Sequence, residues 1–137
     1  MPSKLLIVDD EPDMLRLLTM IIKEKTSHEV TSTNNPMEAL DIFKCNKFDL
    51  LITDLKMPGL DGLDLLKAVR AIDQSIPVIM ITAYAASGAA DEALINVAFD
   101  FIIKPFRKEQ VLFSIERALK WAEMEKENKM LRAQVQS

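Results

Sequence analysis

Five polar residues of this chain each stand where an apolar run ends, and their side chains could carry out chemistry together. They are the adjacent pair Asp9 and Asp10, followed by Asp54, Thr82 and Lys104. Carboxylates that converge raise one another's pKa, so such a group favours the binding of a cation. Mg²⁺ prefers oxygen ligands and is usually held by one or two carboxylates together with phosphate oxygens. The acidic residues therefore predict a magnesium site.

Asp54 is the candidate nucleophile of this group. A carboxylate can attack phosphorus and form an acyl phosphate. The hydroxyl of Thr82 and the ammonium of Lys104 are suited to bind the other phosphoryl oxygens. Since phosphoryl transfer requires mainly positioning and charge neutralisation from a protein, these residue types predict a metal-dependent phosphoryl site.

Strands and helices in alternation must bring these residues together. Apolar runs expected as strands occupy residues 4–8, 28–33, 49–53, 76–81 and 99–103. The segments between them have the helical period, and a short helix is expected at 91–96 after a loop at 83–90. The expected inward-facing residues are Met14, Leu17, Leu18, Ile21 and Ile22 in the first helix, Ala39, Leu40 and Phe43 in the second, Leu63, Leu66 and Val69 in the third, and Val111, Leu112, Ile115 and Leu119 in the last.

This alternation predicts an α/β fold, a doubly wound parallel sheet of five strands with helices on both faces and right-handed crossovers. Ligands of such sheets bind beyond the carboxyl ends of the strands. Four of the five runs end in the polar residues named above, and the more polar run at 28–33 is expected at an edge. We interpret Glu11 as a first-turn helix residue, with Pro12 opening the helix.

Each polar residue alone also has an ordinary explanation. Asp9 suits a helix N-cap, Thr82 suits the end of a strand, and Lys104 suits a solvated strand end. Their shared position at strand ends and their complementary chemistry favour the functional interpretation.

The composition is that of one globular domain. The chain has 137 residues, of which 49% are hydrophobic and 28% charged. A net charge of -4 and a pI of about 5.0 argue against direct nucleic-acid binding. Three glycines are too few for a glycine-rich phosphate loop, and no apolar run approaches the roughly 20 residues of a membrane span. The single Cys45 permits no internal disulfide, and we expect a cytoplasmic protein.

Four motifs, LLIVDDEP, DLLITDLKMPGLDGLDLL, PVIMITAY and DFIIKPF, together resemble the receiver domains of bacterial two-component response regulators, over about residues 3 to 120. The resemblance implies a flavodoxin-like sheet of strand order 2-1-3-4-5. It implies that Asp54 accepts a phosphoryl group from a sensor histidine kinase. It also implies that Asp9, Asp10, Asp54 and the backbone carbonyl of Lys56 bind Mg²⁺, with Mn²⁺ as an alternative ion.

The resemblance also implies roles for residues around the acceptor. Thr82 and Phe101 resemble the switch pair, Lys104 binds the phosphoryl group, and Lys56 and Tyr84 occupy positions that tune hydrolysis. The bond between Lys104 and Pro105 is expected to be cis. Such a domain catalyses its own phosphorylation and slow dephosphorylation, so it is a switch and not a turnover enzyme. The sequence departs from the family where Val97 and Ala98 replace a frequent Gly-Ala pair, and where Phe101 replaces a frequent tyrosine.

The last helix continues past the expected receiver domain, which we assign to residues 1–120. Residues 121–137 contain strong helix formers and no Gly or Pro, and are assigned to a linker helix. Its heptad seam predicts a coiled-coil homodimer, with an asparagine at an a position. The seam residues are Trp121, Met124, Asn128, Leu131 and Val135. The alternative is a solvated, fraying helix end.

This extension resembles the linker of AAA+ enhancer-binding transcription activators, which implies an effector domain outside the chain and control of transcription. The resemblance also offers a second candidate dimer surface, the face formed by the fourth helix, the fifth strand and the last helix. Two other functions stay open. One is a stand-alone receiver that acts through protein contacts. The other is a phosphohydrolase with an aspartyl nucleophile, which usually has a second aspartate where this chain has Lys56.

Overall fold

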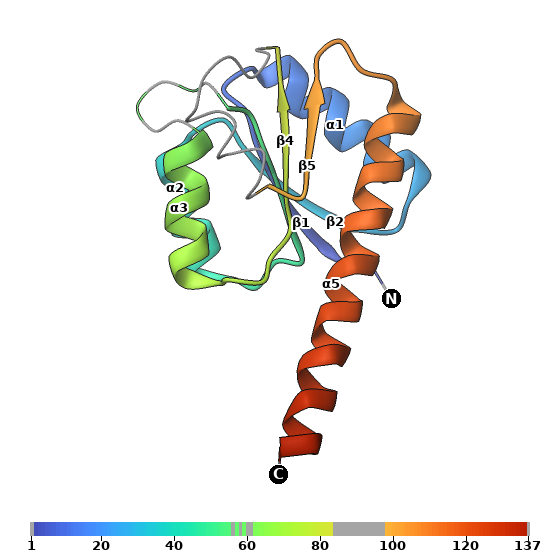
Figure 1. The fold of residues 1–137 in the computed structure, drawn as a ribbon. Helices are drawn as coiled ribbons and strands as arrows, with labels where there is room; N and C mark the ends of the chain where they lie inside the picture. Colours follow the sequence, from blue (N-terminus) through green and yellow to red (C-terminus); the bar gives the residue numbers. More distant parts are fainter. Residues whose placement is uncertain (1, 56, 58, 60–61, 84–97, 137) are drawn as a thin grey trace.

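A parallel sheet with helices on both faces forms the body of the protein (Figure 1). The computed structural model describes residues 2–55, 57, 59, 62–83 and 98–136, with side chains as far as Asn128. The sheet has five strands in the order β2-β1-β3-β4-β5, as predicted. The elements, labelled as in Figure 1, are β1 (Lys4–Val8), α1 (Pro12–Lys25), β2 (Glu29–Thr33), α2 (Pro36–Cys45), β3 (Leu50–Thr53), α3 (Gly62–Ile72), β4 (Val78–Thr82), β5 (Asp100–Ile103) and α5 (Lys108–Gln136).

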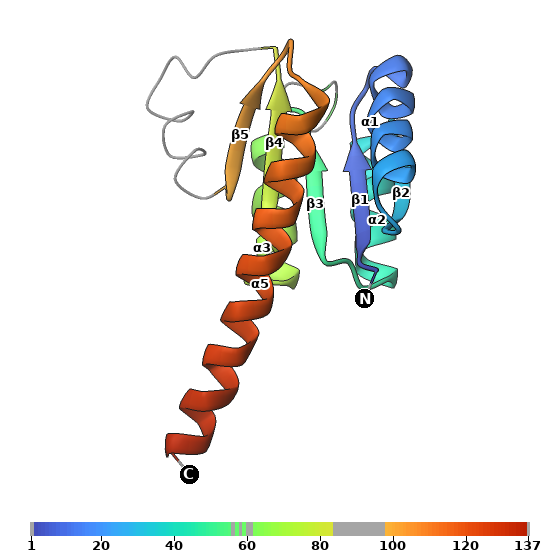
Figure 2. The ribbon, with the colours of Figure 1, turned by 90° about the vertical axis from the view of Figure 1, so that its right-hand side faces the viewer.

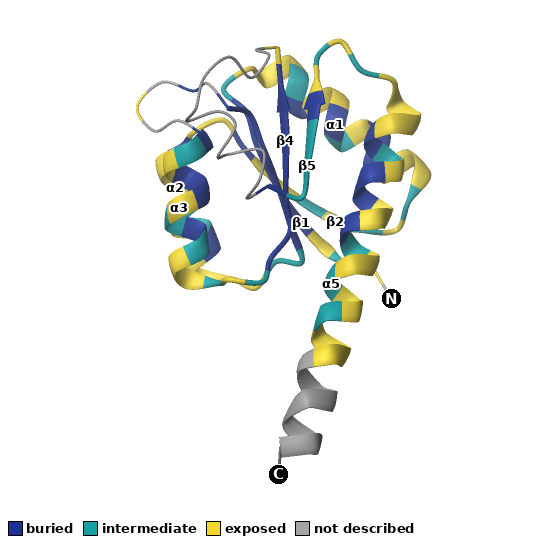
Figure 3. Ribbon diagram, in the orientation of Figure 1, coloured by how far each residue is buried: buried dark blue, intermediate teal, exposed yellow. Residues whose placement is uncertain are grey.

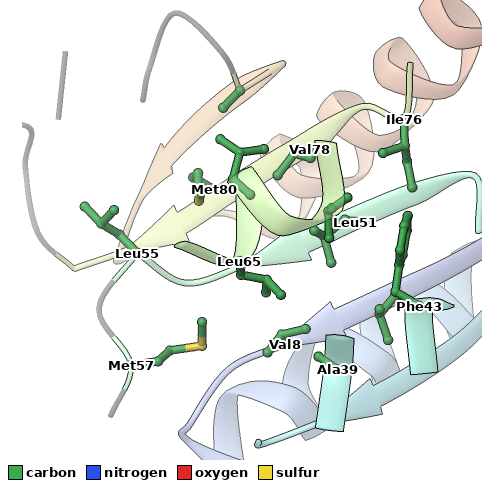
Figure 4. Close-up of a cluster of buried hydrophobic side chains, with 14 residues drawn as sticks. Val8, Ala39, Phe43, Leu51, Leu55, Met57, Leu65, Ile76, Val78 and Met80 are labelled. Carbon is green, nitrogen blue, oxygen red and sulfur yellow. The ribbon is translucent and has the colours of Figure 1, made fainter. Parts of the chain in front are cut away.

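Alternate residues of the central strands face opposite helical layers, as the pleat requires. Leu6 and Val8 of β1 belong to the cluster beneath α2 and α3, which Figure 4 shows in close-up. Leu5 and Ile7 belong to the cluster beneath α1 and α5. Both faces of the inner strands are therefore buried (Figure 3), which explains why their sequences are continuously apolar.

The buried face of α1 differs by one residue from the predicted one. Leu15 is buried against the α1 and α5 cluster, whereas Leu17, expected inside, is 39% exposed. Leu18 and Ile22 are buried as expected. The helix carries leucine, isoleucine or methionine on two adjacent faces, so its period alone does not select between them.

Helix α2 begins with a side-chain cap at Asn35. The side chain of Asn35 accepts hydrogen bonds from the backbone N–H groups of Met37 and Glu38, and Pro36 opens the helix. This cap fixes the exit of the chain from β2, on the same edge of the sheet as the candidate site.

Helix α5 is a single helix of 29 residues that crosses the expected boundary at residue 120 without interruption. Its first half packs on the sheet through Val111, Ile115 and Ala118, which are fully buried. Figures 1 and 2 show its second half continuing well beyond the body of the domain. The predicted C-terminal helical extension is therefore confirmed.

Some predictions fall outside the described residues, namely the short helix at 91–96 and the positions of Lys56, Tyr84 and Val97. Where the structure describes the chain, none of its helices is both long and apolar enough to span a membrane.

Candidate functional site

Backbone hydrogen bonds extend the sheet just past the strand ends and place the predicted site residues on one rim. The N–H of Asp9 donates to the carbonyl of Thr33 at 3.3 Å, and the N–H of Asp54 donates to that of Val8 at 3.1 Å. On the other side, the N–H of Lys104 donates to the carbonyl of Thr82 at 2.8 Å. Residues far apart in the sequence therefore meet at the carboxyl edge of the sheet, as predicted.

The ammonium group of Lys104 lies between two of these carboxylates. Its Nζ donates to Asp9 Oδ2 and to Asp54 Oδ2, both at 3.1 Å, and lies 4.0 Å from Glu11 Oε1. The side chains of Lys104, Asp9 and Asp54 are 10%, 2% and 6% exposed. Contacts between ions so well buried are short and strong, so they hold the three side chains in a fixed arrangement.

The ammonium group contacts three members of a cluster of four carboxylates. Asp9, Asp10, Glu11 and Asp54 each offer an oxygen atom within 4.8 Å of the others. An all-oxygen set of this kind has the ligand chemistry that hard divalent ions prefer, so the residues present fit Mg²⁺. The predicted acids are thus brought together. Glu11 was interpreted only as a helix residue, yet its carboxylate joins the cluster.

Glu11 occupies the N-cap position of α1, and its own side chain does not cap the helix. Its backbone N–H instead donates to Asp9 Oδ1 at 2.9 Å. This bond orients the Asp9 carboxylate, whose other oxygen accepts from Lys104. The signal that would have included Glu11 is its place beside two aspartates at a strand end.

The electrostatic environment acts differently on the two buried partners. Burial raises the pKa of Asp9 above its ordinary value of 3.8, and the charge of Asp54 adds to this, although the Glu11 N–H and the Lys104 ammonium oppose it. Burial acts to lower the pKa of Lys104, but its hydrogen bonds to Asp54 and Asp9 and their negative charges outweigh burial. Its pKa therefore lies above the ordinary 10.5, and Lys104 is cationic at neutral pH.

The predicted switch residues lie on β4 and β5, the strands that end at Thr82 and just before Lys104. Thr82 is fully buried at the end of β4. Phe101 on β5 is half-buried and packs against the cluster beneath α2 and α3. The bond between Lys104 and Pro105 is cis, as predicted.

Gly62, which the sequence analysis did not single out, supports the acceptor loop. Its N–H donates to the Leu55 carbonyl at 2.7 Å, and an added Cβ would lie 2.3 Å from the backbone oxygen of Asp54. Only glycine allows the first turn of α3 to approach the Asp54 backbone so closely. The available signal was a glycine at the start of a helix, directly after the loop that follows Asp54.

Three residues of the predicted dimer seam have described side chains. Trp121 is 39% exposed and Met124 is 56% exposed, and Asn128 is also exposed on α5. The side chains of Leu131 and Val135 lie outside the described part, although their backbone is helical. The described seam residues are available for contact, and a partner for them stays a prediction.

The sequence matches the response regulator receiver domain family over residues 5–116. Regulatory protein AtoC of Escherichia coli is 38% identical over 125 residues, which cover 91% of this chain but only 27% of AtoC. Chemotaxis protein CheY of Listeria monocytogenes is 38% identical over 85% of this chain and 98% of its own length. A crystal structure of NtrX from Brucella abortus superimposes with a TM-score of 0.87 and 31% identity, over 96% of this chain and 30% of NtrX. The chain belongs to the response regulator receiver domain family.

Proposed function

We propose that this chain is a phosphoacceptor switch in which Asp54 receives a phosphoryl group from a phosphohistidine of a sensor histidine kinase. The observation that carries the proposal is the placement of the Lys104 ammonium between Asp9 and Asp54 at 3.1 Å from each. A nucleophilic carboxylate, a fixed cation and a set of oxygen ligands meet at one point, which phosphoryl transfer requires.

In the proposed reaction, a carboxylate oxygen of Asp54 attacks phosphorus and forms an O–P bond. The P–N bond to the histidine ring breaks, and the ring nitrogen keeps the electron pair and takes a proton from solvent. Lys104 binds a phosphoryl oxygen, and the Thr82 hydroxyl binds another. Mg²⁺, or Mn²⁺ in its place, would be held by Asp9, Asp10, Asp54 and the carbonyl of Lys56, and supplies neutralising charge.

The same site supports switching instead of turnover. The product stays attached to Asp54, so each molecule acts once until slow hydrolysis by water returns the carboxylate. The new negative charge changes the partners of Lys104 and Thr82, and Phe101 lies three residues before Lys104 on β5. Phosphorylation thereby biases a two-state equilibrium of the β5 side of the domain, and Tyr84 and Lys56 tune the return.

For the output, we propose that the chain is the regulatory part of a longer transcription regulator. AtoC and NtrX are both much longer than this chain and match it over nearly its whole length, including most of α5. The net charge of -4 disfavours binding of DNA by the chain itself, so we assign that contact to an effector domain outside it. A stand-alone receiver is the second candidate, because CheY of Listeria monocytogenes is matched over 98% of its length.

The α5 extension supports a parallel homodimer. With Trp121 and Asn128 at a positions and Met124 at d, Lys120 takes a g position and Glu125 the following e position. Between parallel helices in register, these two side chains pair with opposite charge. The face of β5 and α5 offers a second surface through Phe113, which is 66% exposed.

Intact-mass measurement tests the phosphoacceptor proposal directly. The chain is incubated with Mg²⁺ and a small phosphodonor such as acetyl phosphate, beside Asp54→Asn and the matched control Asp41→Asn, an exposed aspartate on α2. Wild type and the control should gain one phosphoryl mass, and Asp54→Asn should gain none. Equal labelling of all three proteins, or of none, would reject Asp54 as the acceptor, and a chelator should abolish labelling.

Sedimentation tests the dimer. The intact chain should sediment as a dimer, whereas a chain ending at residue 120 and the full-length variant Met124→Glu should sediment as monomers. A monomer in every case would reject the coiled-coil proposal. The substitution Lys126→Gln, on another exposed position of α5, is the matched control and should leave the dimer intact.

A further inference from the structure

The backbone of Glu11 is fixed at the rim of the sheet, whereas its carboxylate is not. Its N–H donates to Asp9 Oδ1 at 2.9 Å, and its carbonyl accepts the N–H groups of Met14 and Leu15 at 3.1 and 3.2 Å. The side chain is 62% exposed and makes no capping hydrogen bond to α1. A change of rotamer can therefore move the Glu11 carboxylate without disturbing the start of the helix.

The Lys104 ammonium carries three N–H donors, and the structure gives it carboxylate contacts of two kinds. Those with Asp9 and Asp54 are hydrogen bonds of 3.1 Å to side chains that are buried. The contact with Glu11 Oε1, at 4.0 Å, is too long for a hydrogen bond and involves an exposed carboxylate. Lys104 therefore has a third, weaker carboxylate partner beside its two strong ones.

The present position of Lys104 conflicts with the binding of a divalent ion at this cluster. The proposed ion ligands include Asp9 and Asp54, the two carboxylates that hold the ammonium group. Two cations that share these oxygens repel each other, so Lys104 must give up part of these contacts when an ion binds. Its side chain is only 10% exposed, and a buried ammonium without a counter-charge is costly. Lys104 then needs another anion close by.

We propose that Glu11 is a positioning residue that takes over the Lys104 ammonium when a divalent ion binds Asp9 and Asp54. The inference rests on the proposed metal-dependent function of the site. A rotation of the Glu11 side chain that shortens the 4.0 Å contact to about 2.8 Å produces a charge-assisted hydrogen bond. Because Glu11 supplies this movement, the ammonium stays beside Asp54, where it can bind a phosphoryl oxygen.

A simpler role for Glu11 is to attract the ion by its charge alone. An exposed carboxylate acts weakly in this way, since water and salt screen its charge. The two roles differ in their dependence on Lys104. Positioning requires the ammonium group, whereas attraction of the ion by the Glu11 charge does not, so replacing Lys104 separates them.

The affinity for Mn²⁺ tests this dependence in wild type, Glu11→Gln, Lys104→Met and the double variant. Free Mn²⁺ is measured by electron paramagnetic resonance without phosphodonor, and Mg²⁺ is added as a competitor. Glu11→Gln should raise the Kd by about fivefold in the wild-type chain and by less than about twofold in Lys104→Met. Lys104→Met alone should lower the Kd, because its competing charge is gone. An equal effect of Glu11→Gln in both backgrounds, or a Kd raised by Lys104→Met, would overturn the inference.

Two further variants guard the measurement. Asp13→Asn is the matched control, because it removes one negative charge from the first turn of α1 at a side chain that is 96% exposed. It should change the Kd by less than about 1.5-fold, and a change as large as that of Glu11→Gln would reduce the effect to net charge. The double-variant comparison is repeated with Lys104→Gln, which keeps a hydrogen-bond donor for the buried carboxylates, so that the result does not depend on the stability of Lys104→Met.

These measurements separate the inference from the phosphoacceptor proposal. Failure of Asp54 to gain a phosphoryl mass, with the dependence on Lys104 intact, would reject only the phosphoacceptor proposal. Normal labelling with an unchanged Kd in Glu11→Gln would overturn only the role of Glu11. In the labelling reaction, Glu11→Gln should raise the Mg²⁺ concentration for half-maximal rate by about fivefold and leave the rate at saturating Mg²⁺ within about twofold of wild type. A large loss of the saturated rate would contradict a positioning role.

Discussion

Replacing Gly62 by alanine tests whether the close approach of α3 positions the acceptor. The new Cβ would lie 2.3 Å from the carbonyl oxygen of Asp54 and 2.8 Å from the Cα of Leu55, and both neighbours are backbone atoms. Since real Cβ contacts below 3.0 Å are essentially absent, the Asp54 backbone or the first turn of α3 must move by at least 0.7 Å. The side chain of Asp54 would move with it, away from its contact with Lys104.

The expected cost follows from opposing effects. Forcing atoms into a packed site costs about 1–3 kcal/mol or more, and the better helix propensity of alanine returns up to about 1 kcal/mol. We expect Gly62→Ala to lower the free energy of unfolding by about 2 kcal/mol, a fall in melting temperature of roughly 6–10 °C for a chain of this size. A misplacement near 1 Å can reduce a reaction by about a hundredfold, so phosphorylation should slow by at least about tenfold.

Gly59→Ala is the matched control. Gly59 has a φ of 85° and nothing within 4 Å of an added Cβ, so alanine there strains the backbone, at about 1–2 kcal/mol, without pushing on Asp54. Its melting temperature should fall while its phosphorylation rate, followed by intact mass at a temperature where both variants are folded, stays near that of wild type. Wild-type stability and rate in Gly62→Ala would refute the reasoning. Equal loss of rate in both variants would refute the claim that Gly62 acts through the position of Asp54.

Three further predictions concern charged groups. Lys104→Met leaves the buried carboxylates of Asp9 and Asp54 without their cation, so we expect the free energy of unfolding, measured in urea at neutral pH, to fall by about 3 kcal/mol. A fall of less than about 1 kcal/mol would contradict the role assigned to this ammonium. Burial raises the pKa of Asp9 above 3.8, so its stabilising protonation is complete below 3.8 and lost as pH rises through the raised pKa. In chelator, Asp9→Asn should therefore melt higher than wild type at neutral pH and equally in acid, and a lower melting temperature at neutral pH would oppose this sign. The side chain of His28 is 11% exposed, accepts the backbone N–H of Ser3 just before β1, and contacts Glu116 Oε1 of α5 at 3.0 Å. We therefore expect His28→Ala to lower the free energy of unfolding by about 1–2 kcal/mol in the same urea assay. The exposed control Glu29→Gln should leave the urea midpoint unchanged.

The rim of the sheet could be predicted from the sequence because its signal is local. Asp9, Asp54, Thr82 and Lys104 each follow a run of apolar residues, and parallel strands necessarily bring their carboxyl ends to one edge. Burial on both faces made those runs unambiguous. The order of the strands and the cis bond came from the resemblance to receiver domains, and both were confirmed.

What the sequence did not reveal depends on how elements dock. Leu15 rather than Leu17 is buried because of the rotation about its axis with which α1 docks on the sheet. In a helix with two apolar faces, the sequence pattern does not determine that rotation. Gly62 matters through one backbone oxygen eight positions earlier, a contact set by the entry angle of α3. Ser114 and Asp100 form a hydrogen bond only because the first half of α5 packs beside the start of β5.

The length of α5 gives the protein mechanical leverage. The part beyond residue 120 spans roughly 24 Å at 1.5 Å per residue, measured from the last residues that rest on the domain. A tilt of about 10° at that fulcrum displaces the far end by roughly 4 Å, close to half the usual spacing between the axes of two packed helices. A displacement too small to notice where α5 meets the sheet is thus magnified, by simple geometry, to the scale at which helix pairs change their packing.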